Sequence, residues 1–143
     1  MNVDKNAPLY AKKEVIINAS AEKIWKIQTD INKWPSWQKD VTEAKLKGEL
    51  KKGTEFSWKA KGMNINSTIE EVEPKNKIGW SGKSFGMSAV HIWYFEKTGD
   101  KTKVISEESL SGTFPKLIKL IKPNFLEQSL EKSLKKLKTQ AEK

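Results

Sequence analysis

The sequence predicts an α+β fold in which a curved antiparallel sheet of about seven strands packs around a long C-terminal helix. Three observations predict it. From about Val41 to Gly112, apolar and polar residues alternate between regularly spaced Gly or Pro turns. After Gly112 the apolar residues follow helical spacing, and before Val41 one strand pattern precedes two short helical patterns. This order is typical of a sheet with one face covered by helices.

The 143 residues are expected to form a single domain, because they contain no repeat, low-complexity tract or Gly/Ser/Pro-rich linker. Residues 1–9 carry no strand or helix pattern, which predicts a flexible N-terminus. The N-terminus lacks the apolar run of a signal peptide, and no stretch is long and apolar enough to span a bilayer. We therefore expect a cytoplasmic protein without stable membrane insertion.

The first elements are a strand over residues 10–18, which ends in a β-branched run, and a helix over residues 21–27. Ser20 is a good N-cap for this helix, and Glu22 lies near the positive end of its dipole. A turn and a second short helix are expected within residues 30–37, where Trp34 and Trp37 flank a Pro-Ser pair. These rings either pack against the edge of the sheet or lie over the mouth of a cavity.

Six sequential strands follow, and their hairpins set which residues face each other. The predicted strands are residues 41–48, 54–62, 63–73, 77–84, 87–97 and 103–112. A turn at Gly99-Asp100 predicts the pairs Phe95–Val104, Trp93–Ser106, His91–Glu108 and Ala89–Leu110. We favour this face as the inward one, although the opposite face, with Val90, Ile92 and Tyr94, is also apolar.

The C-terminal segment is a long amphipathic helix with Leu on one side and Lys on the other. Pro123 predicts a kink or break near residues 122–124. Basic amphipathic helices also bind membrane surfaces, but here the apolar stripe is expected to cover the sheet. Phe114, Leu117 and Ile121 are accordingly placed against the core or the cavity.

Composition excludes several kinds of site. The chain has no Cys and a single His, so a disulfide framework or a zinc site of N and S ligands is not expected, nor is any cofactor. The net charge is +9, yet every basic residue is Lys. Without the bidentate donors of Arg, this charge indicates a solvated surface rather than a nucleic-acid site.

Sheet parity identifies the candidate cavity residues. Trp58 shares its face with Phe56 and Ala60 while lysines occupy the other face, and Trp80 shares its face with Ile78. These rings either fill the core or line a cavity together with Met63 and Ile65. His91 and Glu108 are the candidate catalytic pair; alternatively they orient a polar group of a ligand, or Glu108 only satisfies a buried imidazole.

Three segments carry a family resemblance: INASAEKIWKIQTDINKWPSW, IEEVEPKNKIGWSG and HIWYFEKTGDKTKVISEESLSG with the helix that follows it. In this order they resemble the SRPBCC superfamily of START-like domains, and within it most closely the bacterial branch related to polyketide cyclases and dehydrases. The resemblance implies the helix-grip fold, in which a curved sheet wraps around the terminal helix, and an internal cavity. It implies no catalytic signature.

The function expected from this evidence is binding or carriage of a small apolar or amphipathic ligand, by a monomer or homodimer that does not bind nucleic acid. Two alternatives stay open: a cyclase/dehydrase-type enzyme that uses the His-Glu pair, and a co-chaperone-like protein-binding module. Binding is favoured over catalysis. The expected ligand-binding residues are Trp58, Met63, Ile65, Trp80, His91, Trp93, Phe95, Glu108, Phe114, Leu117 and Ile121, with Trp34, Trp37, Phe85 and Met87 at the mouth.

Overall fold

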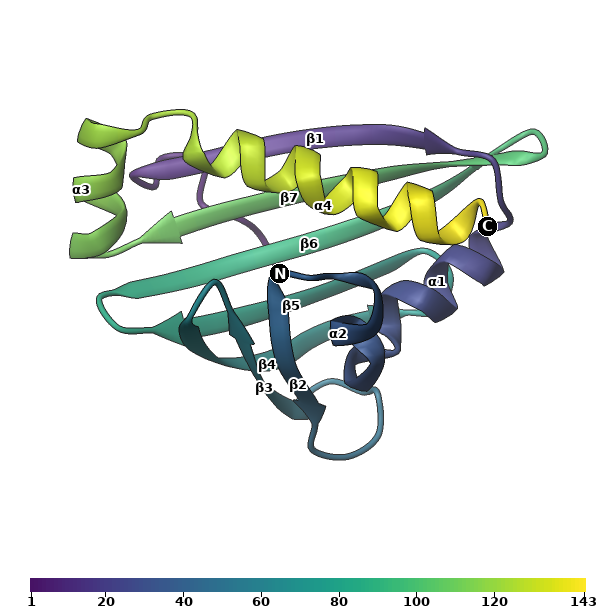
Figure 1. Ribbon diagram of the computed structural model, residues 1–143, viewed down its shortest axis with the longest axis horizontal. Helices are drawn as coiled ribbons and strands as arrows, with labels where there is room; N and C mark the ends of the chain where they lie inside the picture. Colours follow the sequence, from purple (N-terminus) through teal and green to yellow (C-terminus); the bar gives the residue numbers. More distant parts are fainter.

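Seven strands form one antiparallel sheet in the order β1-β7-β6-β5-β4-β3-β2, and helices lie against one of its faces (Figure 1). The structure is a computed structural model that describes residues 1–143. Its elements are β1 (Leu9–Ile17), α1 (Ala21–Thr29), the 3-10 turn η1 (Ile31–Lys33), α2 (Trp34–Trp37), β2 (Val41–Leu46), β3 (Glu55–Ala60), β4 (Met63–Glu73), β5 (Lys77–Ser84), β6 (Met87–Thr98), β7 (Lys101–Ser111), α3 (Thr113–Ile121) and α4 (Phe125–Ala141). The predicted fold class and order of elements are confirmed.

The helices cover different parts of the sheet. Helix α4 runs along β1 and β7, whereas α1 and α2 lie near the opposite end of the molecule from α3 (Figure 1). Ser20 caps α1 as predicted, because its hydroxyl accepts a hydrogen bond from the N–H of Lys23 at 3.1 Å. This arrangement leaves the concave side of β3 and β4 less covered than that of β1 and β7.

The hairpin of β6 and β7 has the predicted register. All four predicted pairs are observed, including His91 opposite Glu108 and Trp93 opposite Ser106. Trp93, Phe95 and Val104 are buried in the main core, so the favoured face does point inward. A short turn and strict alternation determine both results, since each residue added to the turn would shift the pairing.

The N-terminal segment, for which the sequence predicts flexibility, packs on the outer face of the sheet. Leu9 is already part of β1 and is buried. The N–H of Asp4 donates to Ser109 Oγ at 3.1 Å, and the terminal amino group of Met1 lies 3.7 Å from a carboxylate oxygen of Glu71. Gly79 provides the space, because a Cβ there would lie 2.5 Å from the sulfur of Met1.

The C-terminal helix is broken at residues 122–124, as Pro123 predicted. Helix α4 buries Leu126, Leu130, Leu134 and Leu137, and α3 crosses the end of the sheet at a steep angle to α4 (Figure 1). The expectation that Leu117 and Ile121 pack inward is wrong. The break turns α3 off the line of α4, and this leaves both side chains exposed to solvent.

Candidate functional site

A cavity of about 180 Å³ lies between α4 and the sheet. Its walls come from β3, β4, β6 and β7 on one side and from α3 and α4 on the other, and most of its lining is apolar. The apolar lining residues are Val41, Trp58, Ala60, Met63, Ile65, Met87, Leu110, Phe114, Ile118, Phe125, Leu126 and Leu130. An apolar cavity with a few polar groups is the usual character of a small-molecule site.

The structure brings seven of the predicted site residues together around this cavity. They are Trp58, Met63, Ile65, Met87, His91, Glu108 and Phe114. Alternation along β3, β4, β6 and β7 directs the first six inward, Phe114 reaches the cavity from α3, and α4 leaves a gap above them. Met87, for which the sequence predicts a place at the mouth, is one of the lining residues.

The other predicted residues lie elsewhere. Trp80, Trp93 and Phe95 are buried in the main core and do not line the cavity. Trp93 and Phe95 lie further along β6 than His91, toward α1, whereas Trp80 packs against the rings of Trp34 and Phe56. Trp34 is also a core residue: its ring centroid lies 5.3 Å from that of Trp58, and its ring N–H donates to the carbonyl of Gln28 at 3.0 Å. The placements of these four residues in the cavity or its mouth are therefore corrected.

Two of the expected mouth residues also lie away from the cavity. Trp37 packs against the edge of the main core and borders a shallow surface depression beside α4. Phe85 is almost fully exposed, because it lies at the tip of the tight β5–β6 turn and its side chain projects into solvent. Neither residue contributes to the cavity wall.

His91 and Glu108 form a buried polar pair in the cavity wall. His91 Nδ1 lies 3.3 Å from a carboxylate oxygen of Glu108, and the other ring nitrogen shares a hydrogen bond with Ser106 Oγ at 2.7 Å. The side chains are only 10% and 16% exposed. Glu108, His91 and Ser106 thus form a row of three polar groups on two adjacent strands. Either ring nitrogen of His91 can carry the proton.

Burial keeps this pair neutral at physiological pH. It raises the pKa of Glu108 to about 8 and lowers the pKa of His91 to about 3, since a charged group is poorly solvated there. The neutral carboxyl faces Nδ1 of the neutral imidazole. The pair is therefore suited to donating or accepting a hydrogen bond. A bound polar group that changed the access of water to the pair would also change the proton affinity of the pair.

These pKa shifts predict an unusual pH dependence of stability. Between pH 6.5 and 8 folded Glu108 still holds a proton that the same carboxyl has already lost in the unfolded chain, so the free energy of unfolding should fall as pH rises, by about 2 kcal/mol. Between pH 4.5 and 6.5 this trend is offset by His91, whose lowered pKa makes stability rise with pH. Urea unfolding at several pH values measures the plateau and the alkaline decline.

The matched variant is Glu108→Gln, which keeps the size of the side chain and can still donate to His91. It cannot titrate, so its stability should stay level between pH 6.5 and 8. A decline in the variant as steep as that of the unmodified chain would show that another group is responsible.

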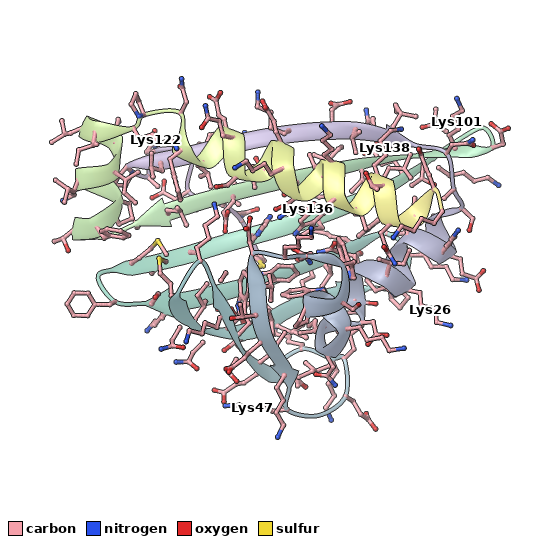
Figure 2. All side chains as sticks on the ribbon, in the orientation of Figure 1. Lys26, Lys47, Lys101, Lys122, Lys136 and Lys138 are labelled. Atoms are coloured by element: carbon pink, nitrogen blue, oxygen red, sulfur yellow. The ribbon has the colours of Figure 1, made fainter.

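A polar rim surrounds the cavity on the side of α4 and was not predicted. It consists of Gln38, Asp40, Lys61, Lys132 and Lys136, with the hydroxyls of Ser129 and Ser133 nearby. Lys136 Nζ donates to Asp40 at 3.0 Å, and this hydrogen bond lowers the pKa of Asp40. Figure 2 shows Lys136 at the edge of α4 that faces the rest of the sheet.

Lys61 is the rim residue with the most distinctive local structure. It precedes Gly62 in the β3–β4 turn and has a left-handed backbone, with φ of +51°. This conformation directs its amine toward α4, where it lies 5.3 Å from the ring centroid of Phe125. Burial lowers the pKa of Lys61, and the neighbouring charges of Lys132, Lys136 and Lys122 lower it further. The Lys-Gly turn was visible in the sequence, but its distant partners on α4 were not.

The geometry favours enclosure of an apolar group beside a buried His-Glu pair. No three metal-ligating side chains lie close enough to hold an ion, and the chain has no cysteine nucleophile. The polar groups in reach of a bound molecule are the buried His91–Glu108 pair and the basic rim. No helix has the length and apolar character needed to cross a membrane.

Comparison with known proteins shows the same fold in several bacterial proteins. A hypothetical protein from Helicobacter pylori is similar over 97% of this chain and 91% of its own, with a TM-score of 0.86 at 21% identity. A START superfamily protein from Mycobacterium smegmatis covers 93% and 97%, with a TM-score of 0.79 at 16% identity. The Zhui aromatase/cyclase from Streptomyces covers 93% of both chains, with a TM-score of 0.81 at 11% identity.

At these identities the solved structures establish the fold alone. Among curated protein sequences, none matches the chain. The model of one family, described as polyketide cyclase/dehydrase and lipid transport, matches residues 10–142, which is nearly the whole sequence. The START-like resemblance of the sequence is therefore confirmed, and the chain belongs to the polyketide cyclase/dehydrase and lipid transport family.

Proposed function

We propose that the protein binds a small amphipathic molecule, with the apolar part inside the cavity and the polar end at the lysine rim. The observation that carries this proposal is the cavity itself, which has apolar walls, one buried polar pair and a basic opening. Removing an apolar group from water supplies the main binding energy, and the polar groups fix its orientation.

The size of the cavity limits the ligand. Small-molecule sites typically measure about 300–1,000 Å³, and an apolar cavity of about 150 Å³ holds one benzene ring. At about 180 Å³ the enclosed space accommodates a single ring or a short alkyl chain. A larger ligand would extend past the rim or displace α3, whose Phe114 and Ile118 form part of the wall.

The charges at the rim favour an anionic polar end. Lys61 and Lys132 form no ion pair in the structure, while the single carboxylate of the rim, Asp40, already binds Lys136. Burial and, after it, repulsion from neighbouring lysines lower the pKa of Lys61, and a bound anion would offset both by favouring the charged amine. A carboxylate or sulfonate at this position would also avoid burying its own charge, because the rim residues are largely open to solvent.

Native mass spectrometry of freshly purified protein tests the proposal without assuming a ligand. We expect an adduct with the mass of a small amphipathic molecule that is lost on unfolding. Titration calorimetry with octanoate, octanol and octylammonium then compares three head groups on the same chain. Octanoate should bind at least tenfold more tightly than octylammonium, and Lys61→Gln with Lys132→Gln should remove most of that difference. Failure of all three compounds to bind would contradict the proposal.

A second candidate function is proton transfer to or from the bound molecule. The observation that favours it is the 3.3 Å contact between His91 and Glu108 in the cavity wall, where both groups are shielded from water. His91→Gln and Glu108→Gln distinguish the two functions. Variants that bind the native ligand normally but no longer convert it would establish catalysis, whereas weaker binding without any turnover supports an orienting role.

A further inference from the structure

Five of the seven exposed large apolar side chains of the protein belong to α3 and the β5–β6 turn. We call them the α3 surface: Phe85, Phe114, Leu117, Leu120 and Ile121. Phe85 is 98% exposed, Leu120 83% and Ile121 75%. Monomeric proteins seldom expose apolar side chains in such a group unless the surface binds a protein, a membrane or a ligand.

The two segments of this surface are joined in a fixed way. The N–H of Phe114 donates to the carbonyl of Gly86 at 3.1 Å, which connects the start of α3 to the β5–β6 turn. The backbones approach so closely that a Cβ at Gly112 would lie 2.5 Å from the same carbonyl oxygen. Gly112 also has φ of +117°, a conformation that L side chains rarely adopt. Phe85 and α3 are thus held side by side as one surface.

The charges around the α3 surface are all positive. Lys83, Lys116, Lys119 and Lys122 are exposed, and Figure 2 shows Lys122 beside α3. Between Glu108 and Glu127 the chain contains no acidic residue, and Glu127 lies 3.8 Å from Lys13. A second copy of the chain would bring these lysines against one another. A surface that offers both negative charge and an apolar layer suits them better.

We propose that the α3 surface docks the protein onto an anionic lipid bilayer, with α3 lying in the plane of the interface. The nine residues of α3 are too few to span a bilayer but suffice to bury one apolar face. Lysines at its border would contact phosphate groups of the lipids. Phe114 belongs both to this surface and to the cavity wall, so docking places one wall of the cavity at the membrane.

Sedimentation with vesicles tests the docking. The full chain is mixed with vesicles of phosphatidylcholine alone or of phosphatidylcholine and phosphatidylglycerol in equal parts. We expect at least tenfold stronger partitioning onto the anionic vesicles, and a further gain at low salt. The triple variant Phe85→Ser, Leu120→Ser, Ile121→Ser should lose at least tenfold of this binding. Because these side chains are exposed, the triple variant should remain folded by circular dichroism.

Two control variants separate this surface from general attraction by a basic protein. Ile16→Ser removes an exposed apolar side chain from β1, and it should bind normally. A variant without Lys116, Lys119 and Lys122 should bind the vesicles more weakly. A variant without Lys26, Lys47 and Lys101, which lie elsewhere on the molecule, should lose much less binding (Figure 2). Equal losses in both lysine variants, or unchanged binding of the apolar triple variant, would overturn the proposal. So would a concentration-dependent dimer that the triple variant abolishes.

Discussion

Replacing Ser133 by Phe is expected to raise the dissociation constant of the cavity ligand at least 100-fold. Ser133 lies in the cavity wall on α4, on the helix face that also carries Leu130 and Leu137. A phenyl group at this position would occupy most of a cavity of about 180 Å³, as one ring does in cavities of about 150 Å³. A 100-fold loss corresponds to about 2.7 kcal/mol of binding free energy, measurable by calorimetry.

The stability of this variant shows whether the ring fills empty space. A filled cavity gains apolar contacts, so the free energy of unfolding should be unchanged or slightly higher. Thr139→Phe is the matched control, because Thr139 lies on the exposed face of the same helix. This variant should bind the ligand normally. If Ser133→Phe is stable and still binds as tightly as the unmodified chain, the ligand lies elsewhere.

The local part of the site could be predicted from the sequence. The contact between His91 and Glu108 follows from a short turn at Gly99-Asp100 and the alternation of two long strands. Both signals act over short distances along the chain. The break before α4 was predictable for the same reason, since Pro123 acts on its own backbone.

The cavity boundary could not be predicted, because it depends on where α4 crosses the sheet. Parity correctly directed both Trp58 and Trp80 inward, but only Trp58 lies where α4 leaves a gap. Lys61 and Lys132 are 71 positions apart in the sequence and meet only through that crossing. The direction of α3 likewise depends on the contact between Gly112 and Gly86, which no periodic pattern reveals.

The placement of Trp34 affects the functional interpretation. A ring over the cavity mouth would control ligand entry, whereas a ring in the core would stabilise the fold. In the structure Trp34 is 2% exposed and packs within 5.3–5.7 Å of the ring centroids of Phe56, Trp58 and Trp80. Its ring N–H is bonded to the Gln28 carbonyl, so the ring links α1 to the sheet. Its burial makes it a structural residue rather than a gate.

Trp34→Ala should therefore lower the free energy of unfolding by about 3–5 kcal/mol, the usual cost of removing a large buried aromatic side chain. This is a large share of the roughly 5–15 kcal/mol that stabilises a domain, so urea unfolding followed by circular dichroism will detect it readily. Trp37→Ala, at the partly exposed edge of the core, should cost only about 1 kcal/mol. A Trp34→Ala variant of normal stability that bound and released ligand faster would instead show that this ring controls the opening.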